Sequence, residues 1–424
     1  MPRGLIFRLK IKMKDQTFIR RAAELDRDDP IAPFRQKFSI PVRQIYLDGN
    51  SLGAYQDAIH KRVERTLKKE WGESLISSWN QAGWFDWPVQ VGDKIAPLMG
   101  AGAGEVAVGD STSVNLFKGL DALCQLQPDR QVIVVQEKNF ATDGYMAQAL
   151  ARINPKLEVR YWSDESLESV LDAQVACLLL SQVDYRTSAR LDMRAVNRAA
   201  HSVGARVCWD LSHSTGAIPV DVLETESDIA VGCTYKYLNG GPGAPAYIWV
   251  NPDLIEHIQP ALPGWMGDAR PFEFQVDYKP HSGIRRMVCG TPQILSLAAL
   301  DAALDLWSQV DLAQIDGKRQ SLMALFETAL GEQLPGVFEH ISPSDPERRG
   351  SHLSFSHPNA YPIVQALIDD GVVGDYRDPS YLRFGFAPLY LSHADVLESV
   401  NRLARIMREE RWKAPEYQVR KVVT

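Results

Sequence analysis

Short apolar runs alternate with amphipathic segments through the middle of the chain, from about residue 92 to residue 307. The apolar runs have strand length, and they are Gln131–Gln136, Val159–Trp162, Val175–Ser181, Arg206–Trp209, Ile229–Thr234 and Ala246–Val250. Segments with apolar residues at helical spacing lie around them, at Ser113–Cys124, Thr142–Ala151, Glu165–Leu171 and Met193–Val203. Strands that alternate with helices form βαβ units, so the pattern predicts an α/β fold whose mostly parallel sheet is covered by helices.

The last third of the chain has a different pattern. Two long helices are predicted at Leu295–Gln309 and Asp311–Gln333, and shorter elements follow at His352–Ser356, Pro362–Asp370, Tyr381–Gly385 and Ser392–Arg411. This mixture predicts a second, smaller α/β domain. We therefore expect a large domain at residues 73–307 and a small C-terminal domain at 308–424. Residues 1–72, which include a predicted helix at Asp57–Trp71, would form an N-terminal extension and arm that packs with the small domain.

Composition narrows the class of protein. The chain has 424 residues and a formal net charge of −7, and this acidic balance argues against a nucleic-acid-binding protein. No apolar run approaches the roughly 20 residues of a membrane span. The five cysteines are scattered without C-x-x-C spacing, so a disulfide framework and a zinc site are disfavoured and a cytoplasmic location is expected. Residues 1–14 alternate basic and apolar residues, unlike a signal peptide, and we interpret them as an extension with Met13 as a second start.

The most informative residue is a lysine in a polar turn. Lys236 follows the predicted strand Ile229–Thr234, stands between two tyrosines and precedes the glycine-rich turn Asn239–Gly243. A lysine held next to a buried strand is partly desolvated, which lowers its pKa and makes the neutral amine available. That is the requirement for a Schiff-base lysine, although a lone lysine is also explained as a solvated surface charge.

Asp210 and His213 strengthen this interpretation. Asp210 directly follows an apolar run, and His213 lies in the same turn. A carboxylate next to a pyridine nitrogen keeps that nitrogen protonated, and enzymes that use pyridoxal 5′-phosphate (PLP) combine such an aspartate with a Schiff-base lysine. Taken alone, Asp210 is also explained by turn formation or helix capping. The spacing of Asp210 and His213 also occurs in metal sites, but no further ligands with suitable spacing complete such a site.

Two further segments suit a phosphorylated ring. Gly109–Asn115 supplies serine and threonine hydroxyls and free N–H groups at the start of a predicted helix, an arrangement that binds anions. Simple N-capping by Ser111 or Ser113 explains the same residues. Asn139–Asp143 follows another strand, so that Phe140 could stack on a cofactor ring and Asp143 could reach its polar edge. Phe140 is equally explained as a core residue.

Six blocks, taken in chain order, resemble the kynureninase family of bacterial type, which consists of fold-type I PLP enzymes of tryptophan catabolism and the kynurenine pathway to NAD. The blocks are Tyr46–Gly53, Asp110–Phe117, Asn139–Asp143, Trp209–Ser214, Gly232–Asn239 and Arg383–Tyr390. The resemblance implies an aspartate-aminotransferase-like fold and PLP as the cofactor. It also implies a homodimer with active sites at the subunit interface.

The resemblance implies a role for each matching residue. Lys236 would bind the cofactor, Asp210 would pair with its pyridine nitrogen, and His213 would lie close by. Thr112, Ser113 and Tyr235 would hold the phosphate region, with Tyr235 also transferring a proton at the substrate carbonyl. Phe140 would stack on the ring and Asp143 would contact its hydroxyl side. Trp265 and Thr291 would contact the cofactor of the other subunit. Arg383 would bind the substrate carboxylate, and Asn50 and Ser51 would line the active-site loop.

The implied reaction is hydrolysis of L-kynurenine to anthranilate and L-alanine, with 3-hydroxykynurenine as a second substrate. Trp79 and Trp84 are candidates for the aryl pocket or for structural tryptophans. Three alternatives are another fold-type I enzyme, such as a cysteine desulfurase or aminotransferase, a metal-dependent hydrolase, and a binding module without catalysis. A desulfurase needs a reactive cysteine after the lysine, and only Cys289 lies there.

Overall fold

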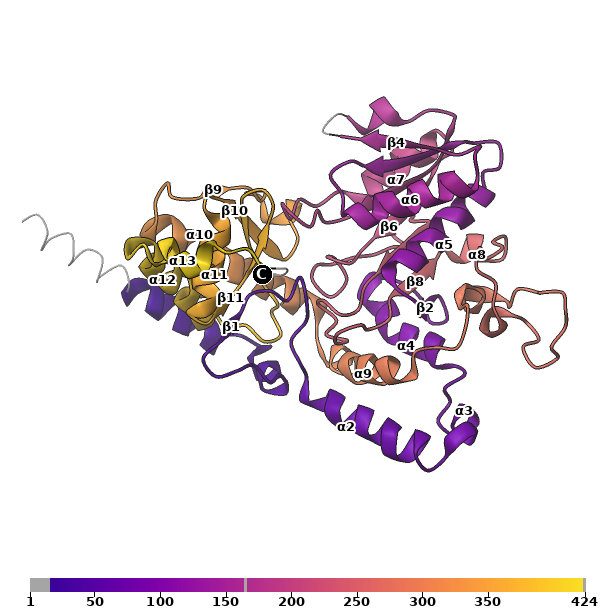
Figure 1. Cartoon of the computed structure of the whole chain (residues 1–424), viewed down its shortest axis with the longest axis horizontal. Coiled ribbons are helices and arrows are strands. Elements are labelled where there is room, and N and C mark those ends of the chain that lie inside the picture. The colour runs from indigo at the N-terminus through magenta and orange to yellow at the C-terminus, as the bar shows by residue number, and fades with distance from the viewer. Residues whose placement is uncertain (1–15, 164–165, 422–424) are drawn as a thin grey trace, which may run out of the picture. The chain divides into compact units, whose positions relative to one another are not determined.

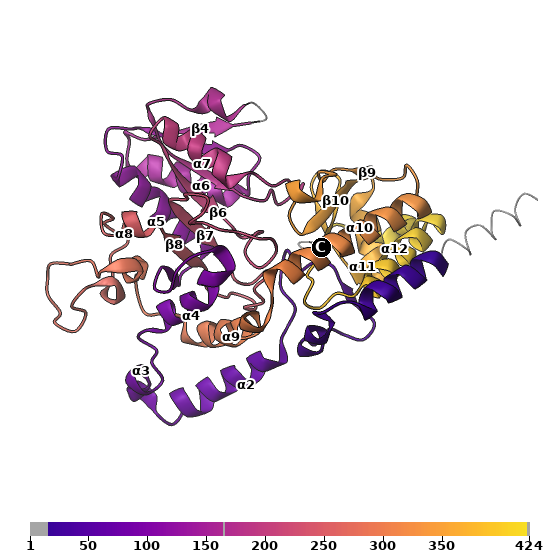
Figure 2. The same cartoon turned by 180° about the vertical axis from the view of Figure 1, so that it is seen from behind.

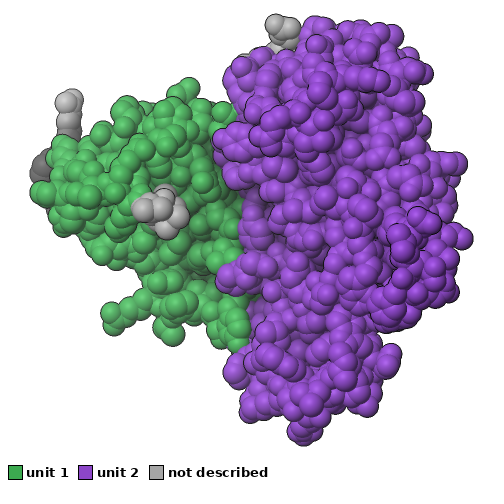
Figure 3. Space-filling view, turned by 45° about the vertical axis from the view of Figure 1, so that its right-hand side comes forward, with its two compact units in different colours: residues 1–55, 186–188, 310–424 green, residues 56–185, 189–309 purple. Residues whose placement is uncertain are grey.

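The computed structural model describes residues 16–163 and 166–421, and the chain divides into two compact units (Figure 3). Unit 2 comprises residues 56–185 and 189–309, and unit 1 comprises residues up to 55, residues 186–188 and residues 310–424. The helix that begins at Asp57 therefore belongs to unit 2. The extension predicted at residues 1–14 lies outside the described residues. The three-part division expected from the sequence stays a prediction.

A seven-stranded sheet forms the centre of unit 2, with the strand order β2-β8-β7-β6-β5-β3-β4. Figure 1 labels β2, β4, β6 and β8 of this sheet. Strands β3 to β7 pair in parallel, whereas β8 is antiparallel to both β7 and β2. The strands are β2 (Val106–Val108), β3 (Val132–Gln136), β4 (Glu158–Trp162), β5 (Val175–Ser181), β6 (Arg206–Asp210), β7 (Ile229–Gly232) and β8 (Tyr247–Val250). The predicted α/β fold with a mostly parallel sheet is confirmed.

Helices cover the sheet, which explains why its central strands are continuous apolar runs. Every residue of β5 is buried, as a parallel strand covered on both faces requires. Helix α5 begins where Ser111 caps the N–H of Val114, and Asp192 caps α7 in the same way. The helices of unit 2 are α2 (Asp57–Arg65), α3 (Ser78–Gln81), α4 (Trp87–Ile95), α5 (Thr112–Gln125), α6 (Ala141–Ile153), α7 (Met193–Ser202), α8 (Pro252–Ile255) and α9 (Ile294–Leu304).

Two elements of unit 2 differ from those that the sequence predicts. The segment 165–171 contains only a 3₁₀ turn at Leu167–Val170, and residue 165 is outside the described residues. Strand β7 ends at Gly232 because the following backbone closes a turn instead of a ladder: the N–H of Gly240 donates to Thr234 O, and Thr234 Oγ1 donates to Pro245 O. This early end creates the turn that carries Lys236.

Unit 1 has its own sheet, an antiparallel one with the order β12-β13-β10-β9, and a separate parallel pair of β1 with β11. Its strands are β1 (Ile45–Tyr46), β9 (Glu339–His340), β10 (His352–Ser356), β11 (Val372–Val373), β12 (Asp375–Arg377) and β13 (Tyr381–Gly385). Its helices include α10 (Leu312–Gln333), α11 (Ala360–Asp369), α12 (His393–Arg408) and α13 (Pro415–Gln418). Phe326 of α10 anchors the core against Phe355, Phe384 and Phe386. Within the described ranges, no helix has the length and apolarity needed to cross a membrane.

Candidate active site

Lys236 and His213 meet at the carboxyl edge of the parallel sheet in unit 2. Lys236 follows β7 and His213 follows β6, and because neighbouring parallel strands end at the same edge, the two turns lie together. Lys236 Nζ is 2.9 Å from His213 Nε2. His213 is buried and Lys236 is half-buried, so the amine sits in the partly desolvated position that the sequence predicts.

Two carboxyl groups, Asp210 and Asp143, face the same region. Asp210 is the last residue of β6, and its Oδ1 accepts a hydrogen bond of 2.8 Å from the N–H of Ser212. Asp143 lies in the first turn of α6 and is fully buried. Burial raises the pKa of Asp143 well above its ordinary value, the charge of Asp210 raises it further, and Lys236 opposes the shift. A cationic group between the two carboxylates would relieve this repulsion.

Tyr235 precedes the lysine and keeps its proton at neutral pH. The neighbouring Cys233 and burial both raise the pKa of the Tyr235 hydroxyl above its ordinary value. The lysine Nζ is 5.9 Å from the centre of the tyrosine ring. A protonated phenol at this position can donate a proton to a developing oxyanion.

The start of α5 supplies N–H and hydroxyl donors. Thr112 and Ser113 occupy its first two positions and are partly exposed, while the Ser111 side chain caps the helix. The preceding residue, Asp110, has a φ of 55° and is tied to the buried Lys118 by an ion pair of 2.9 Å. The capping role considered for Ser111 is therefore confirmed, and it leaves Thr112 and Ser113 at the helix terminus, where an anion binds favourably.

Phe140 is not a core residue. Its side chain is 51% exposed, and its ring meets the Tyr185 ring edge-on, with 5.5 Å between the centroids. Tyr185 was missed in the sequence because it follows β5 in an irregular turn with no periodic pattern. An exposed aromatic ring next to the carboxyl edge is a suitable platform for a planar ligand.

Trp265 and Thr291 lie together in unit 2, with the indole N–H donating to Thr291 Oγ1 at 3.4 Å. The Trp265 ring also contacts Trp79, Phe85 and Phe272. Of the two tryptophans considered for the aryl pocket, Trp84 is buried and donates to Glu70, a structural role. Trp79 instead packs on Trp265.

The remaining candidates belong to unit 1. Arg383 of β13 and Asn50 are fully buried, and Ser51 is partly buried. Arg383 donates to Asp375 through Nε at 2.8 Å and through Nη2, and Nη2 also donates to Ser51 Oγ at 3.0 Å. Asp375 was missed in the sequence, because only the strand register of β12 and β13 places it opposite Arg383.

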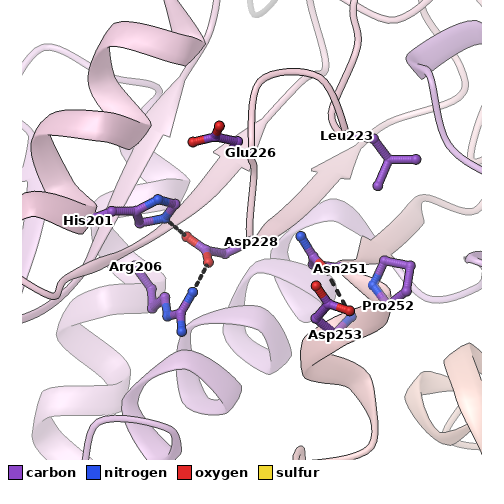
Figure 4. A pocket seen from close by; sticks show the side chains of 8 residues that line it. All are labelled: His201, Arg206, Leu223, Glu226, Asp228, Asn251, Pro252 and Asp253. Carbon is purple, nitrogen blue, oxygen red and sulfur yellow. Dashed lines mark hydrogen bonds and ion pairs between the residues drawn. The ribbon is translucent and has the colours of Figure 1, made fainter.

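A cavity of about 390 Å³ lies at the other edge of the unit 2 sheet (Figure 4). It adjoins the amino ends of β6 and β7, where Asp228 accepts hydrogen bonds of 2.8 Å from both His201 and Arg206. Both side chains are therefore already engaged by Asp228. The cavity lies at the edge opposite the one that carries Lys236 and Asp210.

The residues at the carboxyl edge fit PLP. Unit 2 supplies an amine, an anionic partner for a ring nitrogen, an exposed aromatic ring and a helix terminus for a phosphate. Fold and site together define a PLP-dependent enzyme of fold type I.

Comparison with known proteins identifies the family. Two relatives named kynureninase are 45% identical over 410 residues (Burkholderia pseudomallei strain 1106a) and 44% identical over 411 residues (Pseudomonas fluorescens). They cover 95% and 94% of this chain and 99% and 98% of their own lengths. The family model of the kynureninase C-terminal domain matches residues 315–403. The chain belongs to the kynureninase family, whose members are PLP-dependent hydrolases of carbon–carbon bonds.

Solved structures agree on the fold. A cysteine desulfurase from Escherichia coli matches with a TM-score of 0.74 and 20% identity, covering 89% of this chain and 98% of its own. A mutant of the lyase C-DES with glycine covalently linked to its PLP cofactor matches with a TM-score of 0.76 and 16% identity, covering 87% and 98%. At these identities the likeness concerns the fold alone.

Proposed function

We propose that the protein hydrolyses the Cβ–Cγ bond of L-kynurenine, and also accepts 3-hydroxykynurenine, giving L-alanine and anthranilate or its 3-hydroxy derivative. The observation that carries the proposal is the placement of Lys236 against His213 at the carboxyl edge, in a chain that is 45% identical to a kynureninase over nearly its whole length. L-Kynurenine is both an α-amino acid and an aryl ketone. The site therefore needs an amine, a proton donor and a carboxylate receptor.

The chain's own residues would hold the cofactor from several sides. Lys236 would bind its aldehyde carbon and Asp210 its ring nitrogen, with His213 beside the lysine. Thr112, Ser113 and Tyr235 would bind the phosphate region, Phe140 would stack on the ring, and Asp143 would contact its hydroxyl side. When bound, PLP supplies an electron sink for negative charge that develops next to the substrate nitrogen.

Three side chains would then act on the substrate. The Lys236 amine would take the proton from the substrate α-carbon, a role that suits an amine half-buried against His213. Tyr235 holds the proton that is given to the carbonyl oxygen as water adds, because its raised pKa keeps the hydroxyl protonated. Arg383 binds the α-carboxylate, with Asn50 and Ser51 beside it, and thereby fixes the orientation of the bond to be cleaved.

Turnover of L-kynurenine to anthranilate, followed by anthranilate fluorescence, tests the proposal directly. The Lys236→Ala protein should lose both turnover and the visible absorbance of covalently held cofactor, while Lys156→Ala, a change of an exposed lysine, should keep both. Kinetics with both substrates would establish which is preferred. Normal turnover by the Lys236→Ala protein would overturn the assignment.

We also propose a homodimer in which Trp265 and Thr291 of one subunit contact the cofactor of the other. In support, the loop between α8 and α9 extends away from the sheet of unit 2 (Figures 1 and 2) and exposes 68% of Phe272, 84% of Phe274 and all of Val276. Exposed apolar side chains in such a cluster are typical of a subunit interface. Light scattering should give twice the chain mass, and Phe274→Asp should lower it toward the monomer.

A cysteine desulfurase is the alternative that the shared fold raises. Its nucleophile would have to be Cys289, but burial raises the pKa of this thiol above its ordinary value, and thiolate formation is thereby disfavoured. All five cysteines are free thiols, which suits a reducing compartment, and we propose a cytoplasmic location on that basis. Release of sulfide from L-cysteine at a rate above that of L-kynurenine hydrolysis would favour the desulfurase instead.

A further inference from the structure

A buried lysine lies next to the start of α5 and has no role in the proposed mechanism. Lys118 is about 1% exposed, and its Nζ is 2.9 Å from Asp110 Oδ2. Side chains of a helix lean toward its N-terminus, so Lys118, in the second turn of α5, reaches back to the residue before the cap. An ammonium buried without a counter-charge is costly, and Lys118 therefore depends on Asp110.

Asp110 stands in a turn whose carbonyl groups are already bound. Its φ of 55° is in the left-handed region, and its carbonyl oxygen accepts from the N–H of Ala246 at 3.0 Å. Asn115 binds the carbonyl oxygens on both sides, because its Nδ2 donates to Gly109 O and its N–H to Ser111 O, each at 3.0 Å. The turn therefore presents N–H groups at the start of α5, where such groups have no intrahelical partner.

The Asp110 carboxylate conflicts with this anion site unless its charge is compensated. It lies one residue before the cap of α5, next to the N–H groups that favour an anion, so a phosphate would meet a like charge. Lys118 supplies the opposite charge from inside the protein. Its other contacts are neutral, since Nζ donates to Met287 O at 2.6 Å and interacts with the Cys289 thiol. The positive charge of Lys118 therefore acts on Asp110.

We propose that Lys118 is a positioning residue for the cofactor phosphate and acts through Asp110: it compensates this carboxylate, so that Asp110 can form the left-handed turn without repelling the anion at the start of α5. The inference deepens the proposed function and rests on it, since it places the phosphate at Thr112 and Ser113. A purely structural lysine would affect stability and all ligands alike. A charge that compensates Asp110 affects only ligands that carry a phosphate.

The decisive experiment removes the cofactor from the full-length protein and measures the binding of two ligands. PLP carries the phosphate, and pyridoxal has the same ring without it. Lys118→Met keeps the apolar part of the side chain and leaves Asp110 uncompensated, so we expect the Kd of PLP to rise at least about tenfold. The Kd of pyridoxal should stay unchanged. Inorganic phosphate should compete with PLP for the wild-type protein and compete less well for the variant.

Two companion variants separate charge from structure. Adding Asp110→Asn to Lys118→Met removes the uncompensated carboxylate, and the Kd of PLP should return to within about threefold of the wild-type value. Asp110→Asn alone leaves the charge of Lys118 in excess, so this protein should bind PLP at least as tightly as the wild type. Asparagine suits the left-handed region as aspartate does, and this variant tests the proposal even if Lys118→Met does not fold.

Lys318→Met is the matched control, because Lys318 forms a similarly buried ion pair with Asp29 in unit 1, at 2.7 Å and with 5% and 3% of the side chains exposed. It should lower thermal stability without changing the Kd of PLP. Three results would overturn the proposal. They are an equal loss of PLP and pyridoxal binding in the Lys118→Met protein, no recovery on adding Asp110→Asn, and weaker PLP binding by Asp110→Asn alone.

The outcome separates this inference from the proposed function. A protein that binds PLP in a manner dependent on Lys118, yet does not hydrolyse L-kynurenine, would refute the proposed function alone. Hydrolysis of L-kynurenine by a Lys118→Met protein with wild-type affinity for PLP would refute the inference alone.

Discussion

Replacement of Phe140 should change the affinity for the cofactor much more than the stability of the protein. Half of the Phe140 side chain is exposed, and its described ring contact is the edge of Tyr185 at 5.5 Å. Full burial of a phenylalanine contributes about 1.5–3 kcal/mol and an aromatic pair about 0.5–1.5 kcal/mol. With half the burial, the Phe140→Ala change should cost the cofactor-free protein only about 1–2 kcal/mol of unfolding free energy.

Cofactor affinity should respond much more strongly. Stacking of an aromatic side chain on a heteroaromatic ring contributes about 1–3 kcal/mol, which corresponds to roughly 5- to 150-fold in Kd. Titration of the cofactor-free protein with PLP measures this Kd, and denaturant unfolding of the same sample measures stability. Phe326→Ala serves as the opposite control, because this ring is buried among Phe355, Phe384 and Phe386.

We expect the control to lose about 3–5 kcal/mol of stability and to keep its affinity for PLP. Two results would refute the reasoning about Phe140. One is an unchanged Kd for PLP in the Phe140→Ala protein, and the other is a loss of stability as large as that of Phe326→Ala.

Three further predictions concern stability. Gly385→Ala should destabilise unit 1 strongly, because its new Cβ would lie 1.7 Å from Asn50 Oδ1. Gly331→Ala in α10 meets open space and should stabilise the protein by up to about 1 kcal/mol. Thermal melts of the two variants test both expectations. Burial raises the pKa of Asp48 from 3.8 to about 7, so the folded state loses stability as pH rises between those values, and Asp48→Asn should flatten urea-measured stability over that window. The pKa of Asp143 is raised for the same reason, so Asp143→Asn should stabilise the cofactor-free protein at pH 7 more than at pH 4; the opposite trend would contradict the assigned sign.

The sequence predicts the elements with strong local patterns. The strands at Val175–Ser181, His352–Ser356 and Tyr381–Gly385 are confirmed residue by residue, because each is an apolar or alternating run bounded by polar turns. Strand β2 was missed, because its three residues are too few to establish a period. Its place in the sheet depends on antiparallel pairing with β8, which is more than one hundred residues away.

The site residues also divide into those that a local pattern predicts and those that depend on contacts across the fold. Lys236 and Asp210 were found because each stands at the end of an apolar run, a position that one strand determines. Asp375 and Tyr185 could not be found in this way. The partner of Arg383 depends on the register of two short strands, and Tyr185 reaches Phe140 only through the tertiary fold. Local pattern therefore locates residues at strand ends, and pairing across the fold has to come from the structure.

Unit 1 is formed by segments from both ends of the chain, and this affects how it folds during biosynthesis. Strand β1 near the amino terminus pairs with β11, so that Ile45 lies opposite Val372. A nascent chain emerges from the ribosome amino end first, so β1 has to wait for most of the polypeptide before its partner exists. Unit 2, almost continuous in sequence, can fold in the meantime. Closing a loop of this length is entropically costly and slow, and completion of unit 1 should therefore be the last step of folding, with the early residues open to chaperones until then.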